Sequence, residues 1–148
     1  MLVTRQGDRD FVKVLDFGFA KVAPGMPEPG RGGPADALSR QGFIFGTPRY
    51  MAPEQCVGGA IDGRADLYTL GLILYEMLTG ASPFPEGDSL KTIRHQISTP
   101  TPPMATVAPG LNIPASLEAI VVRLTHKQPD KRYENAAQVL DALAEVVE

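Results

Sequence analysis

The chain has 148 residues, which is enough for one domain with an adequate hydrophobic core, and 43% of them are hydrophobic. Its formal net charge is −3 and it contains no run of basic residues, so its charge does not support binding to nucleic acid or to an anionic membrane. The single cysteine, Cys56, excludes an internal disulfide and fits the reducing cytoplasm, with a small residue after a short helix as its expected role.

The N-terminal region is predicted to contain extended structure followed by a long irregular segment. The run Phe11–Leu15 alternates in polarity like a strand and ends at Asp16-Phe17-Gly18. Residues 19–22 can form a further short strand. Residues 23–37 are dominated by proline and glycine, which predicts neither helix nor sheet there.

The middle of the chain predicts a short helix and then a long central one. Pro53 suits the first turn of the short helix, where the missing N–H of proline costs nothing. The central helix includes the apolar run 67–78 and ends at Gly80, a suitable residue just past a helix. Its apolar residues cover nearly all faces, so we expect it to be buried all round. The run is too short to span a bilayer, which takes about 20 residues.

Three amphipathic helices are predicted in the rest of the chain, over residues 89–97, over 115–126 and from about residue 135 onward. The first carries Leu90, Ile93 and Ile97 on one side. The last has a suitable N-cap in Asn135. The proline-rich stretch 99–114 predicts a rigid spacer between the first two.

Two triplets stand in an order and at a separation that rarely arise by accident. They are Asp16-Phe17-Gly18 and Ala52-Pro53-Glu54. With Asp66–Gly71 and Pro129–Tyr133, they make the chain resemble the C-terminal part of a eukaryotic-type serine/threonine protein kinase, in a bacterial style. The resemblance implies a mainly α fold, an incomplete kinase large lobe with a short β-hairpin at its N-terminus.

The same resemblance implies one partial kinase domain over residues 1–148. Its parts are a hairpin and metal-binding turn over 1–22, the activation segment over 16–54 and a helical subdomain over 55–148. The Gly-rich loop, the strand lysine, the catalytic aspartate and the second metal-binding asparagine of such kinases are absent before Asp16. We therefore expect a fragment that starts just after the catalytic loop and contains no catalytic base.

The resemblance also implies roles for particular residues. Asp16 is expected to hold Mg²⁺, which bridges the phosphates of ATP. Thr47 and Pro48 are expected to face the acceptor residue of the protein substrate, with Thr47 marking serine/threonine specificity. Glu54 and Arg132 are expected to form a buried structural ion pair between the activation segment and the last helices.

Two further residues have alternative interpretations. Asp66 resembles the acid at a helix start that binds the catalytic loop, and the alternative is a simple helix cap. Ser39 is the one hydroxyl side chain between Val22 and Thr47, which makes it a candidate for phosphorylation, with an unmodified serine equally open.

The function implied for the complete protein is transfer of the ATP γ-phosphoryl group to serine or threonine of protein substrates, a transferase that uses ATP and magnesium. This chain alone is expected to be inactive and to hold Mg²⁺ and ATP poorly. The alternatives are a non-catalytic interaction module and a truncated gene product. Because a neighbour of the central helix is not encoded, we expect an apolar face of that helix to be exposed and to support self-association; the candidate side chains are Leu67, Leu70, Leu74 and Met77.

Overall fold

A computed structural model of the protein describes residues 2–6, 9–13, 48–84 and 87–147. The chain divides into two compact units, Met1–Gly33 and Pro34–Glu148. The predicted metal-binding turn and most of the predicted activation segment lie outside the described residues.

The first unit contains the expected β-hairpin. Strand β1 (Leu2–Gln6) pairs with strand β2 (Arg9–Lys13) in antiparallel fashion. The register places Val3 opposite Val12 and Thr4 opposite Phe11. Aligned β-branched and aromatic residues of this kind are typical partners in a two-stranded sheet.

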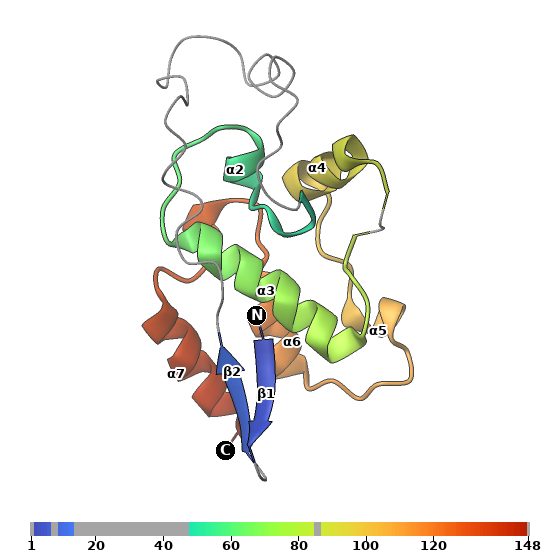
Figure 1. The fold of residues 1–148 in the computed structure, drawn as a ribbon, viewed down its shortest axis with the longest axis vertical. Coiled ribbons are helices and arrows are strands. Elements are labelled where there is room, and N and C mark those ends of the chain that lie inside the picture. The colour runs from blue at the N-terminus through green and yellow to red at the C-terminus, as the bar shows by residue number, and fades with distance from the viewer. Residues whose placement is uncertain (1, 7–8, 14–47, 85–86, 148) are drawn as a thin grey trace. The chain divides into compact units, whose positions relative to one another are not determined.

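The second unit is helical, which confirms the mainly α fold in the described part of the chain (Figure 1). Among its described residues, two elements are single 3₁₀ turns and six are α-helices. They are η1 (Pro48–Tyr50), α2 (Pro53–Cys56), α3 (Arg64–Thr79), α4 (Ser89–Ser98), α5 (Met104–Val107), α6 (Ala115–Leu124), η2 (Pro129–Lys131) and α7 (Ala136–Val147).

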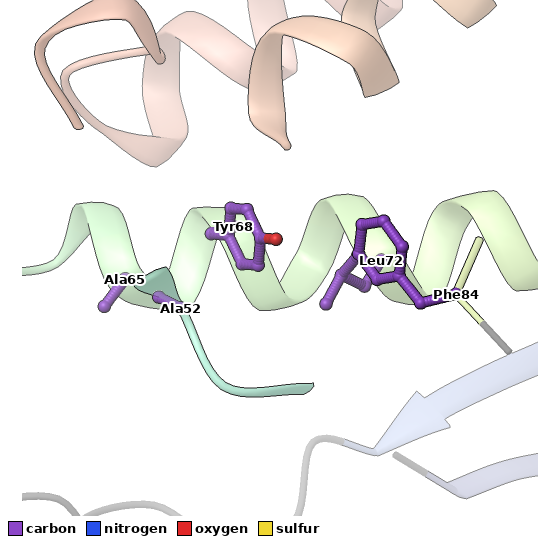
Figure 2. Close-up of a cluster of buried hydrophobic side chains, with 5 residues drawn as sticks. All are labelled: Ala52, Ala65, Tyr68, Leu72 and Phe84. Carbon is purple, nitrogen blue, oxygen red and sulfur yellow. The ribbon is translucent and has the colours of Figure 1, made fainter. Parts of the chain in front are cut away.

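Helix α3 lies at the centre of this unit and contacts η1, α5 and α6 (Figure 1). It contributes to three buried clusters. In the first, Figure 2 shows Tyr68 and Leu72 spaced along α3, with Phe84 beside Leu72. The second cluster joins α3 to α6 and α7, and the third joins α3 to α5 and α6.

The expected burial of α3 on every side is wrong in its last turns. Met77 is 59% exposed, whereas Leu67 is buried. Leu70 and Leu74 are half-buried and pack against the cluster that α3 forms with α6 and α7. The apolar surface expected along this helix is therefore reduced to Met77, because α7 returns to cover the side where Leu70 and Leu74 lie.

The closest approach of α3 to α6 occurs at Gly71. A Cβ atom at this position would lie 2.7 Å from Leu124 Cβ and 2.8 Å from Thr125 Cγ2, well inside van der Waals contact. The absence of a side chain at Gly71 therefore allows the two helices to pack at this distance.

The predicted helix ends are confirmed at three places. Pro53 is the first residue of α2. Gly80 follows α3 with φ of 73°, a left-handed conformation that favours glycine. Asn135 Oδ1 accepts a hydrogen bond of 3.1 Å from the Gln138 backbone N–H in the first turn of α7. This is the geometry of an N-cap.

Two predictions about α4 and its surroundings are wrong. The expected spacer 99–114 contains a short helix, α5, whose Met104 is buried against Tyr75 and Val121. On α4 itself, Leu90 and Ile97 are 61% and 37% exposed, and the buried residues are Thr92, Ile93 and Gln96. No helix in the described ranges is long and apolar enough to cross a membrane.

Candidate substrate-facing site

The structure describes four of the predicted site residues, Pro48, Glu54, Asp66 and Arg132, whereas Asp16, Ser39 and Thr47 lie outside the described residues. Of the four, Glu54 and Arg132 meet directly. Pro48 opens η1, and Asp66 lies on the exposed surface of α3.

The ion pair predicted between Glu54 and Arg132 is present and buried. Arg132 Nη1 lies 2.7 Å from Glu54 Oε1, and Nη2 lies 2.8 Å from Oε2. The Arg132 side chain is 0% exposed. Its Nε donates to the His126 carbonyl at 2.7 Å, and its Nη atoms also donate to the carbonyls of Arg64 at 2.9 Å and Lys127 at 3.2 Å. All five donors of the guanidinium therefore have acceptors, which offsets the cost of burying the charge.

Side chains of both η1 and α3 hold the 3₁₀ turn η1 against α3. Glu76 accepts hydrogen bonds of 2.9 Å from Arg49 Nε and 2.9 Å from the Tyr50 hydroxyl. The Thr69 hydroxyl donates to the Tyr50 carbonyl at 2.9 Å. These three hydrogen bonds fix η1 against α3.

The same turn is held to α4 by Gln96. Its Nε2 donates to the Pro48 carbonyl at 3.3 Å and to the Arg49 carbonyl at 2.5 Å. Its Oε1 accepts from the Tyr68 hydroxyl at 2.6 Å, and that hydroxyl accepts from Lys127 Nζ at 2.7 Å. Sequence reasoning missed Gln96. A helical period set by Ile93, with Gln96 three residues further on, would have indicated its inward position.

The environment of Lys127 disfavours its charged form. Burial, and then the charge of Arg132, lower the pKa of Lys127 to about 8. Its Nζ lies 4.5 Å from the centre of the Phe84 ring and 5.1 Å from that of Tyr68, so aromatic faces partly replace water around the ammonium. Burial raises the pKa of Tyr68, which keeps the hydroxyl protonated.

Asp66 is not the cap of its helix. Helix α3 begins at Arg64, so Asp66 is the third residue of the first turn. A carboxylate there is favourable because the N-terminal end of a helix carries partial positive charge. The acid that binds the helix start is Asp62, which accepts from the Arg64 backbone N–H at 2.9 Å and from the Arg64 guanidinium at 2.7 Å. These hydrogen bonds lower the pKa of Asp62.

The predicted metal ligand, Asp16, lies outside the described residues. Within the ranges that the structure describes, no group of three or more His, Cys, Asp or Glu side chains is arranged to hold a metal ion. The metal prediction therefore depends on Asp16 alone, and its chemistry is that of a hard carboxylate oxygen, which suits Mg²⁺.

The fold of the helical unit is that of a kinase-like helical lobe, as comparison with known proteins shows. The family model described as protein kinase domain matches residues 1–143. The chain belongs to the protein kinase domain family, as a partial domain. A solved structure of the twitchin kinase region from C. elegans matches 64% of this chain and 16% of its own, with a TM-score of 0.58 and 23% identity, which supports the fold.

The similar curated proteins are bacterial serine/threonine kinases. The chain is 45% identical over 144 residues to serine/threonine-protein kinase Pkn1 of Myxococcus xanthus, covering 96% of this chain and 19% of that protein. It is 36% identical over 137 residues to PknB of Mycobacterium tuberculosis H37Rv, covering 91% of this chain and 20% of that protein. The chain thus spans about a fifth of the length of these relatives.

Proposed function

We propose that the protein containing this chain transfers the γ-phosphoryl group of ATP to serine or threonine residues of protein substrates. The observation that carries this proposal is the position of η1. It lies between Thr47 and the Ala52-Pro53-Glu54 triplet, and side chains of α3 and α4 hold it by five hydrogen bonds. A segment that must present an acceptor hydroxyl in a fixed place needs such attachment, because positioning supplies much of the catalysis of phosphoryl transfer.

The proposed roles of the residues follow the chemistry of the transfer. Asp16 holds Mg²⁺ through its carboxylate, and the ion neutralises charge on the phosphates of ATP. Thr47 and Pro48 face the acceptor residue. Glu54, through Arg132, attaches the end of the activation segment to the loop that follows α6.

Two proposed roles concern regulation and the helix start. Phosphorylation of Ser39 would add about −1.5 to −2 charge to the activation segment and allow it to pair with an arginine. Arg40 and Arg49 are two candidate arginines near Ser39 in the sequence. Asp66, exposed in the first turn of α3, is available to accept hydrogen bonds from a catalytic loop supplied from outside these residues.

These 148 residues on their own are proposed to transfer no phosphate and to hold ATP and Mg²⁺ poorly. The fifteen residues before Asp16 contain no Gly-rich loop, no strand lysine of the kinase kind and no catalytic aspartate. One metal-binding carboxylate without these partners neither orients the nucleotide nor accepts the substrate proton. We place the protein in the cytoplasm.

A second candidate function is a non-catalytic module that associates with itself or with another protein. The observation that favours it is the 59% exposure of Met77 near the end of α3. In sedimentation, a module of this kind forms dimers that Met77→Lys disrupts. A monomer at tens of micromolar concentration removes the self-association form of this candidate.

The test of kinase activity compares three proteins made from the complete reading frame of the gene. They are the unchanged protein, Asp16→Asn and, as a matched acid-to-amide control, Asp141→Asn on the exposed side of α7. With radiolabelled ATP and a generic serine/threonine protein substrate, we expect Asp16→Asn to lose at least about a hundredfold of the rate and Asp141→Asn to keep it. Undiminished transfer by Asp16→Asn contradicts the proposed role of Asp16. Transfer by residues 1–148 alone contradicts their proposed inactivity.

A further inference from the structure

We propose that Gln96 is a positioning residue that fixes the carbonyl groups of η1, and that Tyr68 and Lys127 determine which way its amide points. The inference rests on the proposed function, since it assigns to Gln96 the placing of Pro48 against the protein substrate. Gln96 lies on α4, Tyr68 on α3 and Lys127 in the segment after α6, so three parts of the helical unit meet at one turn.

The burial of Gln96 indicates that its amide has a specific task. The side chain is 0% exposed, and burying an amide costs free energy unless its polar atoms find partners. Both polar atoms have them: Oε1 accepts from Tyr68, and Nε2 donates to the carbonyls of Pro48 and Arg49. The outward-facing Leu90 and Ile97 show that α4 does not turn its most apolar side inward at this place.

The chemistry of the chain of hydrogen bonds sets its direction. A charged Lys127 ammonium can only donate, so it uses a lone pair of the Tyr68 oxygen. The Tyr68 proton is then directed to Gln96 Oε1. At the other end, backbone carbonyls can only accept, so the NH₂ group of Gln96 must face η1. Donor and acceptor requirements at both ends thus select one orientation of the amide.

The turn has little internal structure to replace this attachment. Its 3₁₀ hydrogen bond runs from the Met51 backbone N–H to the Pro48 carbonyl at 3.3 Å. That carbonyl is one of the two that Gln96 binds. Gln96 and the Met51 amide thus bind the same carbonyl oxygen, so loss of the Gln96 contact is expected to favour opening of the turn, and the Met51 amide reports on this opening through its hydrogen exchange.

The protonation state of Lys127 makes the orientation of the Gln96 amide dependent on pH. When the pH is below the Lys127 pKa of about 8, the ammonium is charged and can only donate hydrogen bonds. Above it, the amine gains a lone pair, Tyr68 can donate back to Nζ, and Gln96 Oε1 loses its donor. The other ionisable groups around Lys127 are Arg132 on the side of η2 and Cys56 on α2, with Glu54 paired to Arg132 and His95 of α4 stacked on Phe84 at 5.8 Å. Burial raises the pKa of Cys56 to about 11, well above the pKa of Lys127.

The first experiment measures exchange of the Met51 amide in the protein made from the complete reading frame. Gln96→Met keeps the length of the side chain and removes both hydrogen-bonding groups. Gln96→Glu keeps the acceptor that faces Tyr68 and removes the donors that face η1. Val139→Ala on α7 is the control, since it weakens a buried cluster without contacting η1. We expect Met51 to exchange about tenfold faster in both Gln96 variants, the effect of losing roughly one hydrogen bond, and not in the control.

The outcomes of this experiment separate a positioning role from a general loss of stability. Faster exchange confined to η1 supports the proposal, and so does the same change in Tyr68→Phe, which removes only the hydroxyl. Unchanged exchange at Met51 in Gln96→Met overturns it, and so does an equal acceleration in Val139→Ala. Because exchange requires no catalysis, a protein without kinase activity refutes the proposed function and leaves this test of Gln96 decisive.

The second experiment uses steady-state kinetics of the same proteins. We expect Gln96→Met to raise KM for the protein substrate about fivefold or more while KM for ATP stays within about twofold, because the proposed function places the displaced turn against the protein substrate and not against the nucleotide. In the unchanged protein, KM for the protein substrate is expected to rise from pH 7 to pH 9, and Tyr68→Phe is expected to remove this rise. Equal changes in both KM values, or a pH dependence that persists in Tyr68→Phe, contradict the proposal.

Discussion

Arg132 and Glu54, separated by 78 residues in the sequence, are joined by two parallel hydrogen bonds of 2.7 and 2.8 Å. The pair connects α2, immediately after the Ala52-Pro53 peptide, to the end of η2. Because Arg132 also binds the carbonyl oxygens of Arg64, His126 and Lys127, it joins α2, the start of α3 and the segment after α6 at one buried charge.

Removal of one partner of this pair is expected to be costly. Arg132→Met leaves the Glu54 carboxylate buried without its counter-ion, and we expect a loss of about 3–5 kcal/mol in the free energy of unfolding, measured by urea denaturation. Glu54→Gln leaves Arg132 charged and should cost a similar amount. The double variant Glu54→Gln with Arg132→Met should cost clearly less than the sum of the two. Strict additivity would show that the two side chains do not interact.

Substitution of Gly71 tests the close contact between α3 and α6. In an exposed helix Gly→Ala usually stabilises by up to about 1 kcal/mol. Here the new methyl group would lie 2.7 Å from Leu124 Cβ, so we expect Gly71→Ala to destabilise by about 1–3 kcal/mol. Gly63→Ala is the matched control, since nothing lies within 4 Å of its added Cβ, and thermal unfolding of the two variants should differ in direction or in size.

Two tyrosines of α3 should respond to loss of the hydroxyl in opposite ways. The Tyr75 hydroxyl is buried and has no hydrogen-bond partner among the described residues. Tyr75→Phe removes this unpaired group and is expected to leave stability unchanged or to raise it by up to about 1 kcal/mol. Tyr68→Phe breaks the contacts to Gln96 and Lys127 and should cost about 1–3 kcal/mol. Urea denaturation measures both changes in the free energy of unfolding. If the Tyr75 hydroxyl bound a buried water, Tyr75→Phe would also destabilise the protein and the contrast with Tyr68→Phe would be lost.

The reactivity of Cys56 should depend on unfolding. Burial raises the pKa of this thiol to about 11, so at pH 8 the native protein contains almost no thiolate, which is the reactive form. We expect no reaction with a chromogenic disulfide reagent over minutes at pH 8, and complete reaction in urea. Met77→Cys, which places a thiol at an exposed position, should react at once in the folded protein. Rapid labelling of Cys56 without denaturant contradicts its burial.

Local sequence signals predicted the ends of the helices well. Pro53, Gly80 and Asn135 act through their own backbone or side chain within a few residues, so their effects do not depend on the rest of the fold. The kinase motifs likewise indicated the family and the partners Glu54 and Arg132, because the identities and order of these residues are enough to find them.

The inward face of α4 was decided by tertiary structure. The periodicity of Leu90, Ile93 and Ile97 predicted an apolar face, but the surface that α4 meets includes the carbonyl oxygens of η1, and these need a donor. Gln96 therefore faces inward and Leu90 outward. Tertiary structure likewise produces the close contact at Gly71 and the lowered pKa of Lys127. Each depends on groups distant in the sequence that only the folded chain brings within reach, whereas the motifs and caps are properties of the sequence itself.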